Sequence, residues 1–239
     1  MQKIESYFNT LRLSGMSQAW QALAESRQHL SLSLVDGLEL LLDAESLERD
    51  QRRTKRLHHN AAFRYQASIE EIKYDSTRGV DKSLILHLST CQFISKGESI
   101  LITGSTGCGK SFIATALGHQ ACALGYKVSY FNVQKLMMKT KIAKVDGSIN
   151  RLFDKISKSQ LLILDDFGLT HFDKIQQLDL MEIIEDRHGK YATIIASQLP
   201  VASWFDIIAE ETLADAILDR LIHTSHRIEL KGQSLRKKL

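Results

Sequence analysis

The chain has 239 residues, of which 44% are hydrophobic and 25% charged, and its formal net charge is +3. These values are ordinary for a globular protein, and a single proline argues against long disordered linkers. No apolar run approaches the roughly 20 residues that a membrane span needs, and the N-terminus lacks the apolar core of a signal peptide. Three cysteines without metal-ligand spacing indicate a reducing compartment. We expect a cytoplasmic, nucleoid-associated protein with no membrane partner.

Residues 1–80 predict a small, all-helical N-terminal domain, because apolar residues recur at helical spacing and no strand pattern occurs. The first helix is expected to end at Gly15, and the second to run from about Ser17 to His29. Ser33 and Asp36 have the spacing of a capping box, which predicts the start of a third and longest helix. The apolar stripe of that helix consists of Leu34, Leu38, Leu41, Leu42 and Leu47.

The third helix becomes basic as it proceeds. Its arginines recur three and four residues apart, so they share one face, which suits the phosphates of duplex DNA. The alternative is a solvated helix face, which is what most charge runs are. A run of one sign dominated by arginine favours phosphate contact. The candidate DNA-binding residues are Arg49, Arg52, Arg53, Lys55, Arg56 and Arg64.

A connector over residues 66–82 is expected to dock on the next domain through Ile69, Ile72 and Tyr74. From about Leu84 a helix leads to a nucleotide-binding domain, which we assign to residues 81–239. Within that domain, residues 133–158 are helical and basic, and form a second, weaker candidate surface for DNA.

A glycine-rich loop with the pattern G-x-x-x-x-G-K-S lies between a β-branched strand and an alanine-rich helix. Backbone N–H groups of such a loop surround phosphate oxygens, and the helix that follows presents its positive end to the same anion. Lys110 would reach the β- and γ-phosphates of ATP, and Ser111 would bind Mg²⁺. A chance glycine turn would not explain the agreement of strand, loop, Lys-Ser and helix. The predicted ATP-binding residues are Gly104, Ser105, Thr106, Gly107, Cys108, Gly109, Lys110 and Ser111.

Two carboxylates follow the fully apolar strand that begins at Leu161. In an open α/β sheet, ligands bind at the carboxyl ends of the strands. Asp165 is therefore expected beside Mg²⁺, and Asp166 beside the water that attacks the γ-phosphate. The strand over residues 191–197 ends in Ser197 and Gln198, which could hold that water or be ordinary strand-end residues.

Five apolar strands alternating with helices predict a parallel, helix-covered sheet. The segments LLILDDFG (161–168), SQLP (197–200) with Trp204, and residues 214–236 closely resemble the IstB family. These are AAA+ ATPases encoded beside the transposase of certain bacterial insertion sequences, and they are similar to the DnaC helicase loaders. The resemblance covers essentially the whole chain. It implies an AAA+ P-loop fold with a five-stranded parallel sheet and, because nine residues follow Leu230, a C-terminal lid that is absent or minimal.

The resemblance also implies roles for single residues. Asp165 and Asp166 stand at the Walker B positions, Gln198 or Ser197 at sensor 1, Arg220 at the arginine finger and Arg236 at sensor 2. An arginine finger acts on a neighbour's γ-phosphate, so hydrolysis should require a homo-oligomer, either a ring or a filament. Many AAA+ proteins carry Glu where this chain has Asp166, which suggests slow or activator-dependent hydrolysis.

The function expected from these features is that of an ATPase that helps DNA transposition. It would bind duplex DNA, oligomerise with ATP and recruit or regulate a transposase encoded alongside. The alternative is a DnaC-like loader that acts on a replicative helicase and prefers single strands. A third possibility is a nucleotide-gated scaffold that hydrolyses little ATP, which overlaps with the transposition hypothesis. A fourth is a small-molecule kinase, but this would need a pocket for the phosphate acceptor and a lid, and the sequence indicates neither.

Overall fold

The computed structural model describes residues 2–235, apart from the side chains of Gln2 and Ser76. The chain divides into two compact units, residues 1–56 and 57–239. Residues 57–80, which we grouped with the N-terminal helices from sequence, pack in the second unit. The reason is apolar burial: Leu57, Ala61, Ile69 and Ile72 belong to the core of that unit. The expected docking of the connector is thereby confirmed.

The first unit is helical, as expected. It contains α1 (Gln2–Thr10), α2 (Ser14–Glu25), the short 3₁₀ helix η1 (Gln28–Leu30) and the first part of α3 (Leu34–Ala61). Half of the capping box expected at the start of α3 is present: Ser33 Oγ accepts from the Asp36 backbone N–H, but the Asp36 carboxylate accepts from the Ser33 hydroxyl rather than from its backbone N–H.

Gly15 does not end a helix, which corrects the sequence-based expectation. It lies in the first turn of α2, where a Cβ atom would come within 2.4 Å of the Ala44 carbonyl oxygen. The glycine therefore allows α2 and α3 to approach closely. The Glu45 carboxylate accepts from the N–H groups of Gly15 and Met16, which caps α2.

The apolar stripe of α3 is largely uncovered in the described structure. Leu34, Leu38, Leu42 and Leu47 are exposed, and Leu41 is half-buried. The close contact of α2 with α3 lies at Ala44 and Glu45 instead, because that is where Gly15 removes the steric barrier.

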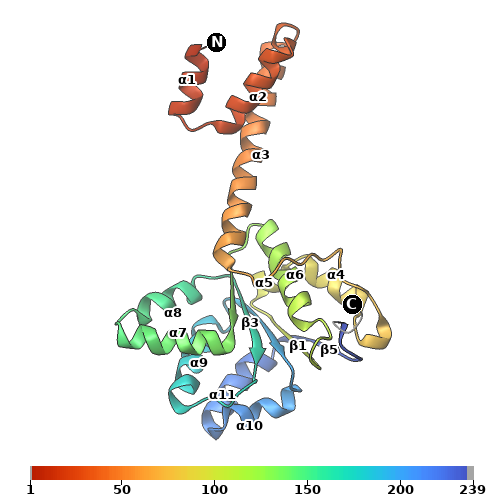
Figure 1. Ribbon diagram of the computed structural model, residues 1–239, viewed down its shortest axis with the longest axis vertical. Helices are drawn as coiled ribbons and strands as arrows, with labels where there is room; N and C mark the ends of the chain where they lie inside the picture. The colour runs from red at the N-terminus through yellow and green to blue at the C-terminus, as the bar shows by residue number, and fades with distance from the viewer. Residues whose placement is uncertain (1, 236–239) are drawn as a thin grey trace. The chain divides into compact units, whose positions relative to one another are not determined.

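The second unit contains a five-stranded parallel sheet with the spatial order β2-β3-β4-β1-β5 (Figure 1). All five strands expected from sequence are present: β1 (Ser99–Gly104), β2 (Val128–Asn132), β3 (Leu161–Phe167), β4 (Ala192–Ser197) and β5 (Ser225–Leu230).

The α-helices of the unit after α3 are α4 (Lys82–Ser89), α5 (Gln92–Lys96), α6 (Lys110–Ala123), α7 (Val133–Val145), α8 (Ile149–Ser157), α9 (Lys174–Arg187), α10 (Trp204–Ile208) and α11 (Glu211–Ile222). Two 3₁₀ turns, η2 (Ser76–Arg78) and η3 (Val201–Ser203), complete it. The single helix expected before β1 is divided into α4 and α5, because Cys91 between them has a left-handed backbone with φ of 58°.

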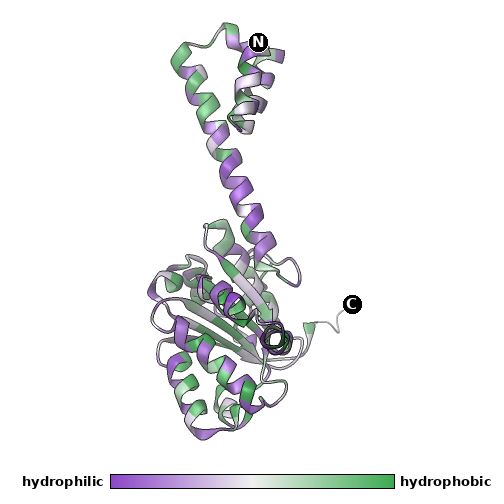
Figure 2. Cartoon of the chain, turned by 90° about the vertical axis from the view of Figure 1, so that its left-hand side faces the viewer, coloured by the Kyte–Doolittle hydropathy of each residue, from purple (hydrophilic) through white to green (hydrophobic). Residues whose placement is uncertain are grey.

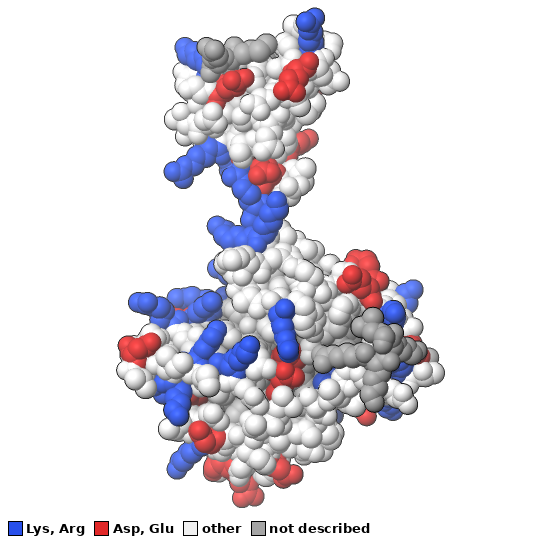
Figure 3. Space-filling view, in the orientation of Figure 1, with Lys and Arg blue, Asp and Glu red and all other residues white. Residues whose placement is uncertain are grey.

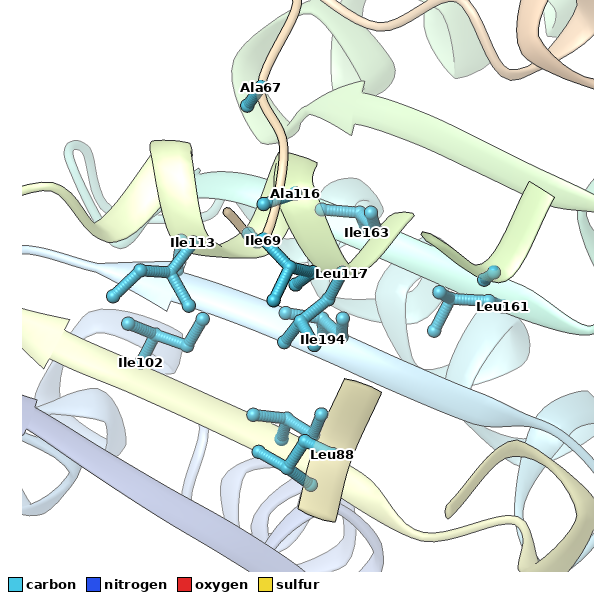
Figure 4. Packing of buried hydrophobic residues seen from close by; sticks show 14 of the residues in the cluster. Ala67, Ile69, Leu88, Ile102, Ile113, Ala116, Leu117, Leu161, Ile163 and Ile194 are labelled. Carbon is cyan, nitrogen blue, oxygen red and sulfur yellow. The ribbon is translucent and has the colours of Figure 1, made fainter. Parts of the chain in front are cut away.

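Alternating strand residues supply the two cores of this unit. Ile100 and Ile102 face α4, α5 and α6, whereas Leu101 faces α7 to α11. Both faces of the sheet are thus covered, which is why β1, β3 and β4 are mostly apolar, whereas the edge strand β5 carries polar residues and buries only Ile228 and Leu230 (Figure 2). Figure 4 shows Ile113 and Leu117 of α6 packed against Ile102 and Ile194 of the sheet.

A buried arginine joins the helical layer to the start of the interior strand β4. Arg187, at the end of α9, is 1% exposed and donates to the carbonyls of Ile156, Ser159 and Ala192.

All three cysteines are free and buried. Among the described residues, no helix is both long and apolar enough to cross a membrane.

Candidate nucleotide-binding site

The loop between β1 and α6 has the backbone that its glycines require. Gly104, Gly107 and Gly109 have φ values of 144°, 81° and 105°, which side-chain-bearing residues rarely adopt. A Cβ atom on Gly104 would lie 2.3 Å from the Leu230 carbonyl oxygen, and one on Gly107 would lie 2.1 Å from Ser234 Oγ. The loop can therefore keep this shape only with glycine at these positions.

Lys110 begins α6 and is buried. Its Nζ atom donates to the carbonyls of Gly104 and Ser105 at 2.7 and 2.8 Å. The ammonium group is thus held inside the curve of the loop, at the N-terminal end of α6. This is the position from which a lysine can neutralise bound phosphate.

Ser111 and Asp165 meet at the ends of α6 and β3. Ser111 Oγ donates to Asp165 Oδ1 at 2.8 Å, and Asp165 is 1% exposed. Tyr130 donates to the other carboxylate oxygen, and the Asp166 N–H donates to Oδ1 at 3.0 Å. A hydroxyl and a carboxylate are the oxygen donors that Mg²⁺ prefers, so this pair fits the ion. The described residues contain no cluster of three His, Cys, Asp or Glu side chains, so the other Mg²⁺ ligands would be phosphate and water.

Asp166 has an unusual backbone. Its φ is 58°, and the pairing of β3 with β4 shifts register between Leu164 and Phe167. The shift interrupts the strand alternation that would place Asp165 and Asp166 on opposite faces. Asp adopts left-handed backbone more readily than most residues, which gives a structural reason for Asp rather than Glu here.

Two side chains contact the Asp166 carboxylate. Asn132 Nδ2 donates to Oδ2 at 2.8 Å, and Arg64 Nη1 lies 3.9 Å from the same oxygen. Burial and the neighbouring Asp165 raise the pKa of Asp166, while Arg64 and Asn132 oppose that rise.

Sequence reasoning missed Tyr130 and Asn132. Both lie on β2, which pairs in parallel with β3 so that Asn132 stands opposite Asp165. The signal available was their position at the end of the strand before the acidic one.

The two sensor-1 candidates have different environments. Gln198 Oε1 accepts from Thr106 Oγ1 of the phosphate loop at 2.7 Å. Ser197 is fully buried, donates to the Phe167 carbonyl and accepts from the Leu199 N–H. Gln198 is therefore the member of the pair that the structure brings to the loop.

A cavity of about 350 Å³ lies beside the loop, and the connector forms one of its walls. Its lining includes Ile72 and Val80 of the connector, Cys108 of the loop and Phe112 of α6. Arg78 of the same connector donates to the Cys108 carbonyl at 3.2 Å. Glu71, Lys73 and Arg78 line the cavity as well, so it offers both apolar surface and charged groups, which suits the base of a nucleotide.

Arg220 lies at the opposite end of β1 from the phosphate loop. It lines a small pocket with Ser99 and Thr193, which are near the starts of β1 and β4, and it forms an ion pair with Glu185 of α9. Arg220 therefore cannot reach the nucleotide site of its own chain. Arg236 lies outside the described residues; the residue before it, Leu235, donates its N–H to the Gly107 carbonyl at 2.9 Å.

The candidate DNA-binding residues 49–56 all lie on α3, as expected (Figure 3). Arg49 pairs with Glu45, and Arg52 pairs with Glu48, each one helical turn earlier. Lys55 and Arg56 are exposed. Arg64 differs from the rest, because its contact is with Asp166 of the nucleotide site.

The sequence profile of the IstB-like ATP-binding proteins matches residues 6–239. The chain belongs to this family. An insertion sequence ATP-binding protein of Sinorhizobium fredii is 43% identical over 230 residues, covering 96% of this chain and 94% of its own length.

Solved structures agree on the fold of this family member. The DnaC helicase loader matches 74% of this chain and 99% of its own with a TM-score of 0.57 and 20% identity. The replication initiator DnaA, bound to AMPPCP and single-stranded DNA, matches 72% of this chain and 52% of its own with a TM-score of 0.61 and 18% identity. The AAA+ fold and the family resemblance expected from sequence are thus confirmed.

Proposed function

We propose that this chain is an ATP-hydrolysing helper of DNA transposition, which binds duplex DNA, oligomerises with ATP and recruits or regulates a transposase. The observation that carries the proposal is the Ser111–Asp165 hydrogen bond beside the buried Lys110, because it assembles the metal and phosphate ligands of an ATPase. Membership of a family of insertion sequence ATP-binding proteins supplies the biological context.

In the proposed mechanism, the loop N–H groups and Lys110 hold the β- and γ-phosphates. Ser111 and Asp165 would hold Mg²⁺, which supplies charge neutralisation on the phosphates. Asp166 accepts a proton from the attacking water or orients it. Gln198 accepts a hydrogen bond from Thr106 of the loop, and in this proposal it senses the γ-phosphate.

Arg220 supports the oligomeric part of the proposal. It is separated from its own phosphate loop by the length of β1, so an arginine finger at this position would act on a neighbouring subunit. Arg236, the proposed sensor-2 arginine, follows a residue that is bonded to the loop.

Calorimetry with ATP and Mg²⁺ tests the nucleotide site. Lys110→Ala should abolish ATP binding, since it removes the buried ammonium group. Retained affinity in this variant would contradict the assignment of the loop.

Binding to matched single- and double-stranded DNA, with ATP and with ADP, tests the partner. We expect ATP-dependent binding to duplex, with growth of the particle in light scattering. A preference for single strands would favour a helicase loader instead.

The salt dependence of binding locates the duplex contact. Replacing Arg52, Arg53 and Arg56 with Gln should lower the slope of log affinity against log salt by roughly one unit for each lost phosphate contact. The matched control replaces Lys82, Lys96 and Lys174 with Gln. It removes the same number of positive charges, but at positions outside α3. An equal change in both variants would place the DNA site elsewhere.

A further inference from the structure

A groove beside Asp166 is open and basic. Its volume is about 690 Å³, and its lining includes Arg64, Phe131, Asn132 and the exposed lysines Lys135 and Lys139 of α7. The Lys139 ammonium lies 5.4 Å from the centre of the Phe131 ring, at the wall of the groove. Figure 3 shows Lys and Arg side chains gathered over α7 and α8. Three cations thus line a groove in which Asp166 is the acidic member.

Arg64 joins this groove to the nucleotide site. Its guanidinium lies 3.9 Å from Asp166 Oδ2, which is longer than a hydrogen bond, and its side chain is 62% exposed. An exposed ion pair at this distance contributes little free energy, so a stronger anion can replace the carboxylate. Phosphate is such an anion, because guanidinium binds it in a bidentate manner.

The backbone on either side of Arg64 is anchored, so exchange of partner requires only side-chain motion. The Phe63 ring lies 4.2 Å from that of His119 on α6 and 6.2 Å from that of Tyr130 on β2, measured between ring centres. Tyr65 packs against the core of the unit, and its carbonyl oxygen lies 3.4 Å from His119 Nε2. The contacts of Phe63 and Tyr65 hold the segment while the Arg64 side chain lines the groove.

We propose that the groove binds a backbone phosphate of DNA, and that this phosphate takes Arg64 away from Asp166. While Arg64 and Asn132 both engage Asp166 Oδ2, that oxygen is less available to a water molecule. DNA in the groove therefore raises the rate of ATP hydrolysis. The inference rests on the proposed ATPase function, and it makes Arg64 a positioning residue that acts through Asp166.

The test compares ATP hydrolysis by the full-length protein with and without a short duplex, for the parent chain and Arg64→Gln. We expect Arg64→Gln to hydrolyse ATP several-fold faster without DNA and to respond little to DNA. Arg64→Lys, which keeps the charge but not the bidentate geometry, should restore part of the response. Lys174→Gln removes one positive charge outside the groove and should behave as the parent. A melting curve by circular dichroism establishes that each variant is folded.

DNA binding by fluorescence anisotropy gives a readout that does not need hydrolysis. Replacing Lys135 and Lys139 with Gln should weaken duplex binding about tenfold at low salt, as expected for two lost phosphate contacts. The same double variant should require correspondingly more DNA for half-maximal stimulation. If millimolar inorganic phosphate stimulates as well as duplex does, the groove responds to free phosphate and the DNA assignment is wrong.

Three further outcomes separate this inference from the proposed function. Unchanged basal hydrolysis and unchanged DNA stimulation in Arg64→Gln would overturn the inference while leaving an active ATPase. Absence of ATP binding in the parent chain would instead overturn the proposed function. Whether or not ATP binds, unchanged DNA affinity in the Lys135/Lys139 double variant would show that the groove does not bind DNA.

Discussion

Asn132 connects the basic helix α7 to Asp166 through the two ends of one amide. Its Nδ2 donates to Asp166 Oδ2 at 2.8 Å, and its Oδ1 accepts from the Lys135 N–H at 3.2 Å, which caps α7. Asn132 also stands opposite Asp165 in the β2–β3 register. A displacement of the start of α7 would therefore change the hydrogen bonding of Asp166 directly.

Asn132→Ser separates the two functions of this amide. Serine is also a good N-cap residue, so α7 should remain capped, but its side chain is too short to reach Asp166. We expect basal ATP hydrolysis to rise several-fold, because Asp166 loses a restraining donor whose net contribution is about 1 kcal/mol. Steady-state hydrolysis and a thermal melt measure the two effects. A slower enzyme with an unchanged melting temperature would mean that Asn132 orients Asp166 productively.

The contact between Gln198 and Thr106 can also be tested by mutation, because a role of Gln198 in loop shape can be separated from a role at the γ-phosphate. Gln198→Ala removes the 2.7 Å hydrogen bond to the phosphate loop. If Gln198 also contacts the γ-phosphate in the transition state, hydrolysis should fall by about 10²–10³ while ATP affinity, measured by calorimetry, changes little. The control is Thr106→Val, which removes the same hydrogen bond but leaves the glutamine in place. Equal losses in the two variants would assign Gln198 to loop shape alone.

Local patterns were enough to predict the sheet and the phosphate loop. β1 to β4 are short runs rich in β-branched, aliphatic or aromatic residues, and β5 places Ile228 and Leu230 among polar residues. The loop is bounded by a strand and a helix, so local sequence predicts both the sheet and the loop. The Ser111–Asp165 pair was predictable for a related reason. In a parallel sheet, the carboxyl ends of strands meet at one edge, and the loop after β1 therefore meets the end of β3.

Features that depend on contacts between distant residues were not predictable in this way. Gly15 resembled a helix stop because its packing against Ala44 is visible only in the folded chain. Arg64 appeared to belong to the basic face of α3, but the chain leaves the helix at Ala61 and brings Arg64 to Asp166. The left-handed backbone of Asp166 depends on the register shift between β3 and β4, which has no local sequence signal.

Glu45 predicts how the stability of the N-terminal helices varies with pH. Burial tends to raise the pKa of Glu45, but the hydrogen bonds from Arg49 and from the N–H groups of Met16 and Gly15 lower it below its ordinary value of 4.5. Because the folded-state pKa is depressed, the stabilisation is complete above that ordinary value and is lost as the pH falls through the folded-state pKa.

Hydrogen exchange of the peptides from α2 measures this effect. Glu45→Ala should expose the N–H groups of Gly15 and Met16 without an acceptor, at a cost of roughly 1–3 kcal/mol to the local opening free energy. Protection in the parent should decrease below pH 4.5, whereas protection in the variant should show little of this decrease. Glu48→Ala, which removes a carboxylate on the same helix but not the cap, is the control. Equal pH dependence in the parent and in Glu45→Ala would exclude Glu45 as the titrating cap.

Arg220 is held by Glu185 of its own chain, so its proposed action on a neighbour can be tested from both sides of that ion pair. Arg220→Ala should bind ATP normally but lose hydrolysis by a factor of about 10³, the scale typical of arginine fingers. Mixing it with Lys110→Ala subunits should restore some activity, because an intact loop in one subunit then faces an intact Arg220 in another.

Glu185→Gln is the matched control, since it releases Arg220 without removing it. If the ion pair with Glu185 only holds the Arg220 guanidinium while the subunits are apart, it competes with oligomerisation. This variant should then retain hydrolysis and reach half-maximal activity at a lower protein concentration. If Arg220 instead has a purely structural role at the start of β1, Glu185→Gln and Arg220→Ala should lower the melting temperature alike, and the mixed subunits should remain inactive. The protein-concentration dependence of hydrolysis therefore distinguishes a finger acting between subunits from a local structural arginine.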